Sequence, residues 1–405
     1  MAATISNTRT RYIPELLETH VEELEFLWGQ RRAALYSTSY NLRSFADLTE
    51  RVEAHIQGLL AIPEVLADLL MPRLTGEDRD GVFAAACPLL RLGDPAITKQ
   101  LLLVFANAQG AALAGLRDAF SFAPSGQFVM AIRELLELGD SAHAVAAAVI
   151  LSNQRLLDPT SLRLSNLLQD ENPDVVEYAW KAVTEADTRK PSNLPRPYHQ
   201  ALAHTDPKVR QAVLFSAAWS RQAWLLPAVR QLAAAKDQMG MACLAALGQA
   251  EDLATLLTYT SNLTAQTEAC YLLARFGHPG VMEVLGKGMV SSDKALAAAS
   301  GEAFTLITGV DINGERQQLP VSPEADEFEQ EFADLVWMPD ITKAQAYWQQ
   351  HGKRLSTGSR WRQGINLDGK VSVPTLAQID LQARWDACAR AAQSGYPLAS
   401  PPPIY

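Results

Sequence analysis

Apolar residues recur along the middle of the chain with the spacing of one helix face. Between residues 142 and 276 the same template, with apolar or small residues at i, i+3, i+4, i+7 and i+8, appears five times. A period of 3.6 residues places these positions in one stripe along a helix. The copies begin at Ala142, Val175, Val209, Met239 and Ala269, so the steps between them are 33, 34, 30 and 30 residues.

A repeat of this length is typical of stacked helix pairs. Residues 224–232 and 253–259 fill the space between copies with a second, shorter helix. Many alanines lie on the stripe, and small side chains let neighbouring helix pairs pack closely. A further copy beginning at Val82 moves the start of the array to near residue 65. We therefore predict an all-α fold in which residues 65–310 form an α-solenoid of stacked antiparallel helix pairs.

Several of the predicted helices carry an explicit start signal. Asn172 and Asp206 each precede a proline at the head of a repeat, and Asp94 does the same earlier in the chain. An Asn or Asp side chain can accept hydrogen bonds from free amides, and proline suits the first helical position because its missing N–H costs nothing there. The sequence therefore predicts helix N-caps at these three residues.

The two ends of the chain differ from the repeats. Residues 13–32 and 46–60 read as two amphipathic helices, so residues 1–64 are predicted to cap the array. Residues 317–342 contain no Lys or Arg but many acidic residues, which indicates that 311–342 are a charged connector or exposed helix. Residues 343–405 contain three of the eight tryptophans and predict a small helical module with a proline-rich tail at 400–405.

Charge and cysteine usage narrow the possible functions. The 405 residues have a formal net charge of −10, which argues against a surface built to bind nucleic acid or an anionic membrane. No apolar run is long enough to span a membrane or to serve as a secretory signal. The four cysteines lie far apart, so no disulfide framework or zinc site is predicted, and a cytoplasmic location is expected. They are Cys87, Cys243, Cys270 and Cys388.

No catalytic motif, cofactor motif or metal-ligand spacing is present, so the prediction is a non-enzymatic protein. One alternative stays open at the N-terminal helices. His20 lies one helical turn from Glu23, and Arg51 lies one turn from His55. If the two helices face each other, His20, Arg51 and His55 could form an acid–base pocket.

Two groups of residues have the types found at binding surfaces. The first lies near a turn between two repeat helices and combines arginine with tryptophan, which are enriched at binding hot spots. The second is the one basic cluster, at 353–370, which could bind a partner or pair with the acidic connector. The predicted protein-binding residues are Arg210, Trp219, Arg221, Trp224, Arg354, Trp361 and Arg362. Trp219 and Trp224 could instead pack between repeat units.

Short segments spread over most of the chain resemble known families. The DPKVR segment at 206–210 resembles a HEAT repeat. A wider resemblance, to a family of uncharacterised bacterial HEAT-repeat proteins whose genes tend to lie among type VI secretion genes, rests on segments in one order. They are IPEL (13–16), HVEE (20–23), FLW (26–28), LTERVEAHIQGL (48–59), GEAFTLITG (301–309) and 348–354.

The resemblance implies a cytoplasmic bacterial protein that handles another protein of a secretion locus. We expect either an accessory or adaptor protein that helps to load an effector, or an immunity protein that blocks a toxin. An acidic surface suits an inhibitor of a basic toxin and suits a chaperone equally well. The alternatives are a HEAT-type, lyase-like enzyme with a pocket near the N-terminal helices, and a general structural scaffold.

Overall fold

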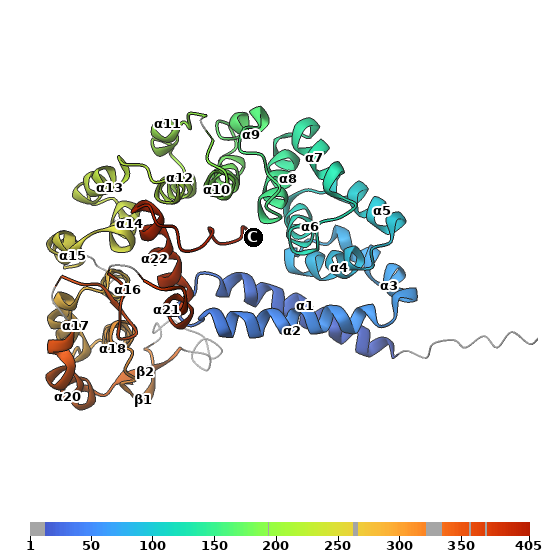
Figure 1. The fold of residues 1–405 in the computed structure, drawn as a ribbon. Helices are drawn as coiled ribbons and strands as arrows, with labels where there is room; N and C mark the ends of the chain where they lie inside the picture. The colour runs from blue at the N-terminus through green and yellow to red at the C-terminus, as the bar shows by residue number, and fades with distance from the viewer. Residues whose placement is uncertain (1–12, 193, 262–265, 321–333, 356–357, 369–370) are drawn as a thin grey trace, which may run out of the picture. The chain divides into compact units, whose positions relative to one another are not determined.

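The computed structural model describes residues 13–192, 194–261, 266–320, 334–355, 358–368 and 371–405. These residues are mostly helical, as predicted, with two short antiparallel strand pairs (Figure 1). The chain divides into two compact units, Met1–Ser220 with Ser400–Tyr405, and Arg221–Ala399. The boundary at Ser220 falls inside the predicted array, and residues 400–405 belong to the first unit.

In the first unit, helices that pack in a continuous series alternate along the chain with shorter helices that pack beside them. Helices α4, α6, α8, α10 and α12 pack in that order, each against the next, and α3, α5, α7, α9 and α11 each pack beside the helix that follows. The helices are α1 (Pro14–Ala34), α2 (Leu42–Leu60), α3 (Pro63–Leu70), α4 (Arg79–Arg91), α5 (Pro95–Phe105), α6 (Gly110–Phe122), α7 (Val129–Leu138), α8 (Ser141–Asn153), α9 (Leu162–Leu167), α10 (Pro173–Arg189), α11 (Tyr198–Leu202) and α12 (Pro207–Trp219).

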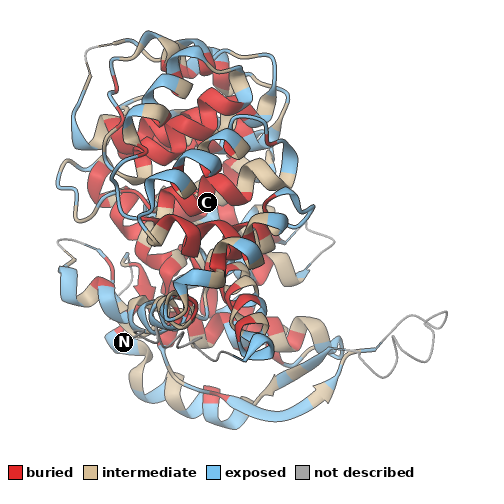
Figure 2. Cartoon of the chain, turned by 90° about the vertical axis from the view of Figure 1, so that its right-hand side faces the viewer, coloured by how far each residue is buried: buried red, intermediate tan, exposed pale blue. Residues whose placement is uncertain are grey.

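The predicted helix starts are confirmed in this unit. Asn172 accepts a hydrogen bond from the Asp174 amide at 3.0 Å, and Asp206 accepts one from the Lys208 amide at 2.7 Å. Asp94 accepts one from the Ala96 amide at 2.7 Å. Each repeat stripe lies within one helix, and buried residues run along whole helices of the interior (Figure 2).

Helices α1 and α2 pack against each other and against α4. Trp28 of α1 stacks on Phe83 of α4 with centroids 3.6 Å apart. Its indole N–H donates to the buried carboxylate of Asp118, which also accepts hydrogen bonds from Arg79 and Arg117. Both predicted N-terminal helices are therefore confirmed, and they share the core of the first repeat helices.

The second unit continues the same alternation. Helices α14, α16 and α18 pack in that order, and α13, α15 and α17 each pack beside the helix that follows. Its elements are α13 (Leu225–Ala234), α14 (Gln238–Leu247), α15 (Leu253–Thr260), α16 (Gln266–Phe276), α17 (Met282–Met289), α18 (Lys294–Thr308), β1 (Asn313–Gln318), β2 (Leu335–Pro339), α20 (Ile341–His351), β3 (Trp361–Arg362), β4 (Ile365–Asn366), α21 (Val373–Gln378) and α22 (Leu381–Gln393).

The predicted acidic connector contains a strand pair that the sequence analysis missed. Strands β1 and β2 pair antiparallel, with Arg316 opposite Trp337 and its guanidinium 4.5 Å from the Trp337 ring centroid. Strand β2 packs on α18, and Asp340 then caps α20. Most of the acidic run, Glu324, Asp326, Glu327, Glu329 and Glu331, lies outside the described residues.

Candidate binding pocket

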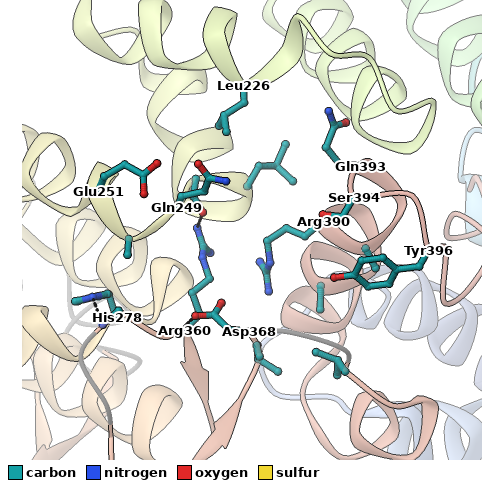
Figure 3. A pocket seen from close by; sticks show the side chains of 18 of the residues that line it. Leu226, Gln249, Glu251, His278, Arg360, Asp368, Arg390, Gln393, Ser394 and Tyr396 are labelled. Atoms are coloured by element: carbon teal, nitrogen blue, oxygen red, sulfur yellow. Dashed lines mark hydrogen bonds between the residues drawn. The ribbon is translucent and has the colours of Figure 1, made fainter.

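A cavity of about 510 Å³ in the second unit lies beside the C-terminal end of α14, the segment that leads into β3, and α22 (Figure 3). Its walls combine leucine side chains with a set of polar and charged groups. The polar lining residues are Gln249, Glu251, His278, Arg360, Asp368, Arg390, Gln393, Ser394 and Tyr396. A cavity of this size with a few converging polar groups has the properties of a binding site.

The β3–β4 hairpin positions the first arginine of this pocket. The Trp361 amide donates to the Gly277 carbonyl just after α16, and the Gln363 amide donates to Leu306 of α18. Gly277 has φ +68°, and a Cβ there would lie 2.5 Å from the Trp361 oxygen, so this contact requires glycine. The hairpin is therefore fixed across the C-terminal ends of α16 and α18.

Arg360 reaches from the hairpin to the C-terminal end of α14. Its guanidinium donates to the carbonyls of Ala245 (2.8 Å), Ala246 (3.2 Å) and Gly248 (2.6 Å) at the end of α14. The last carbonyls of a helix lack intrahelical partners and carry partial negative charge, so a cation is favourable there. Burial and the neighbouring Arg390 nevertheless hold the pKa of Arg360 well below its usual value.

Arg390 brings a second positive charge to the same place from α22. Its Nη1 donates to the Ala246 carbonyl at 2.7 Å, and burial lowers its pKa. Two carboxylates raise its pKa, and of these Asp386 is held by Arg275 in two hydrogen bonds of 2.7 and 2.8 Å. Two guanidinium groups thus converge on the C-terminal end of α14.

His278 lies on another wall of the pocket. Its Nδ1 faces the Gly280 amide at 3.0 Å and its Nε2 faces the Gly358 amide at 3.1 Å. Both neighbours are donors, so a neutral imidazole can accept a hydrogen bond from one of them and a protonated imidazole from neither. Burial and Arg360 lower the pKa of His278, although Asp368 raises it.

The remaining polar groups add hydrogen-bonding capacity. Gln393 donates to the Gln222 carbonyl, whereas its buried Oε1 has no hydrogen-bond partner among the described residues. Glu251 is held by Arg230 at 3.0 Å, and Asp368 accepts from the Arg360 amide at 3.0 Å. The pocket therefore combines apolar walls with one buried and one half-buried arginine, an arrangement suited to a ligand that has an apolar stem and an anionic group.

The first predicted binding group is divided by the unit boundary. Arg210 and Trp219 belong to the first unit, and Arg221 and Trp224 belong to the second. Trp219 is 2% exposed and packs beside Phe215, which agrees with the alternative that it packs in the interior. Trp224 lies at the start of α13 with its indole N–H donating to Gln222.

The second predicted group is mostly interior. Trp361 is 8% exposed and Arg362 is 2% exposed. Arg362 donates to the buried Asp380 at 2.5 Å and to the Ala274 carbonyl at the end of α16. These two residues hold the hairpin on the helices and lie in the interior, whereas Arg354 is exposed. Lys370 lies outside the described residues.

The N-terminal histidines do meet across α1 and α2. The Nδ1 atoms of His20 and His55 lie 3.1 Å apart, and the rings are edge to face. Burial and His20 lower the pKa of His55, while Arg51 is exposed to solvent. Among the described residues, no group of three or more His, Cys, Asp or Glu side chains is placed to hold a metal ion.

Comparisons with other proteins add no assignment, because the chain matches no family model and no curated protein. Within the part that the structure describes, no single helix has the length and hydropathy to cross a membrane. A pair of helical segments, Leu42–Leu60 with Pro63–Thr75, passes the same test only when its two members are taken together across a bend of 105°.

Proposed function

We propose that the chain is a non-enzymatic protein-binding protein, built as a HEAT-like α-solenoid, that acts on a type VI secretion effector or its loading partner in the bacterial cytoplasm. The solenoid part is supported by the 30- to 34-residue step of the repeat stripes and by the serial packing of inner helices within each unit. The secretion part is supported by the ordered segments that resemble the HEAT-repeat family described above.

The observation that carries the proposal is the pair of arginines in the second-unit pocket. Arg360 and Arg390 line one cavity in a chain whose net charge is −10. Asp386 is held by Arg275 in two hydrogen bonds, and Asp368, which also lines the cavity, accepts from the backbone amide of Arg360. A carboxylate brought by a partner would accept charge-assisted hydrogen bonds from this pocket and offset the buried positive charge.

The apolar walls favour a partner side chain over a free inorganic anion. Leu225, Leu226 and Leu247 line the cavity beside the arginines. A glutamate on the partner has a methylene stem for the leucines and a carboxylate for Arg390. Anchors of this kind, desolvated and charge-paired, dominate the energetics of protein interfaces.

The experiment is co-expression of the chain with each protein encoded beside it, scored for complex formation and for rescue from toxicity. A complex that rescues growth supports an immunity protein. A complex that changes effector secretion without rescue supports an adaptor. Absence of any complex would contradict the proposal.

The contact between His20 and His55 keeps the enzymatic alternative testable. Two imidazoles in hydrogen-bond contact, one with a lowered pKa, could exchange a proton near neutral pH. His20→Gln and His55→Gln should abolish the co-expression phenotype if the chain is an enzyme. A phenotype that survives both substitutions removes this alternative, and a complex without any phenotype supports the scaffold alternative.

A further inference from the structure

The first unit holds an extended segment of its own chain in the way that a receptor holds a peptide. Residues 400–405, SPPPIY, contain no helix or strand. Both backbone groups of Ile404 pair with the side chain of Asn153 at the end of α8. The Asn153 Nδ2 donates to the Ile404 carbonyl at 2.8 Å, and the Ile404 amide donates to Oδ1 at 2.9 Å. Because one amide side chain pairs with both backbone groups of the same residue, this contact recognises extended backbone whatever side chain that residue carries.

An aromatic site receives the next residue. The ring of Tyr405 meets the ring of Trp28 edge to face, with centroids 5.0 Å apart. The guanidinium of Arg31 lies 5.2 Å from the centroid of Tyr405 and 4.7 Å from that of Phe45. Arg31 is 6% exposed, and its Nη1 has no hydrogen-bond acceptor among the described residues. The site thus offers aromatic walls and a spare buried donor to an aromatic side chain and its neighbouring acceptors.

The space beside the prolines is not filled by the chain. A cavity of about 470 Å³ runs along Pro401–Tyr405. Its other walls include Tyr36, Phe215 and the side chains of Lys181, Lys208 and Gln211. Proline-rich segments adopt an extended helix without internal hydrogen bonds, and domains that bind such segments use grooves lined by aromatic residues.

We propose that this groove, defined by Trp28, Arg31, Asn153 and the walls of the adjoining cavity, is a docking site for a proline-rich extended segment of a partner protein that carries an aromatic residue. Residues 400–405 are its intramolecular ligand, and the partner's segment displaces them. The inference rests on the proposed protein-binding function and adds the chemistry of the partner. It concerns a different unit from the arginine pocket, so each can fail separately.

The test uses a fluorescein-labelled peptide with the sequence of residues 398–405 and measures its anisotropy with two proteins. We expect a variant lacking residues 400–405 to bind the peptide saturably. The full chain should bind at least tenfold more weakly, because a tethered ligand competes at an effective concentration in the millimolar range. In the shortened variant, Asn153→Ala should weaken binding about tenfold through loss of two hydrogen bonds.

Matched controls separate docking from non-specific adhesion. A peptide with alanine at the position of Tyr405 should bind at least tenfold more weakly, and Lys353→Gln at an exposed position of the second unit should leave peptide affinity unchanged. If the shortened variant unfolds, Tyr405→Ala in the full chain replaces it, and this change should increase peptide binding. A folded, shortened variant that ignores the peptide would overturn the proposal. A full chain that is dimeric only when residues 400–405 are present would assign the groove to a second copy and also overturn it.

Discussion

Replacing Gly115 with alanine tests whether α4 and α6 pack through close approach of their backbones. Gly115 lies in the middle of α6, where this helix crosses α4. A Cβ at this position would lie 2.4 Å from the Arg79 carbonyl oxygen and 2.7 Å from the Cβ of Val82. Neither atom is the end of a flexible side chain, so α4 and α6 must move apart to accept one methyl group.

The expected magnitude follows from two opposing effects. Overpacking of this kind costs about 1–3 kcal/mol. Alanine in a helix interior recovers about 0.5–1 kcal/mol relative to glycine. Because the clash involves backbone, we take the upper part of the range and expect a net loss of about 2 kcal/mol. Gly286 of α17 is the matched control, since a Cβ there meets nothing within 4 Å, and Gly286→Ala should gain about 0.5–1 kcal/mol.

Hydrogen exchange is the suitable assay because a chain with two units need not unfold in one step. Gly115→Ala should lower amide protection in α4 and α6 about thirtyfold, and Gly286→Ala should raise protection in α17 by two- to fivefold. Unchanged protection of α4 and α6 in Gly115→Ala, with the control behaving as expected, would refute the argument that small residues permit this packing.

Three further predictions concern the second unit and the cysteines. Asp380→Ala leaves Arg362 buried without its carboxylate and removes the N-cap of α22, whose side chain accepts from the Ala383 amide. Urea denaturation should therefore show that the free energy of unfolding falls by about 3–5 kcal/mol. A fall below about 1 kcal/mol would contradict the role of the buried pair. The pKa of His278 is lower in the folded chain than its ordinary 6.5, so the unfolded chain takes up the proton first and the free energy of unfolding should fall as pH drops below about 6.5. This pH-dependent loss should disappear in His278→Asn, and the same pH dependence in the variant and the unmodified chain would contradict the prediction. Burial raises the pKa of Cys87 to about 12 and that of Cys388 to about 11, so neither should react with iodoacetamide at pH 8 until the chain is unfolded, as peptide mass spectrometry can check.

The helices that carry the repeat stripes could be predicted because the sequence pattern that marks them is local. A stripe such as Val175, Ala179, Ala182 and Val183 needs only the helical period to be read, and Asn172 places its start within one residue. The shorter helices α13 and α15 were found from the room between stripes and the apolar residues within it. Short-range pattern therefore accounts for most of the helical structure.

The strand pairs could not be predicted in the same way. Strands β1 and β2 are six and five residues long and are separated by 16 residues, and β3 and β4 have two residues each. Their stability comes from docking on α18 and α16, at contacts such as that of Gly277 with Trp361, which no local pattern encodes.

The pocket shows the same limit for function. Arg360 was visible in the sequence as part of a basic cluster, but nothing near Arg390 or Gln393 marks them, because α22 reaches α14 across more than 140 residues of chain. Trp361 and Arg362 have residue types typical of interfaces and yet lie in the interior. Residue type indicates which groups can bind, and only the tertiary structure decides which of them face a cavity.

The most direct measurement of the central claim is the affinity of a co-purified partner for the chain and for two variants that each remove one positive charge. Arg390→Gln changes a residue that lines the pocket, and Lys353→Gln changes an exposed residue outside it. By calorimetry, Arg390→Gln should weaken binding at least tenfold, while Lys353→Gln should stay within about twofold of the unmodified chain. Equal affinities for all three proteins, with Arg390→Gln still folded, would contradict the account.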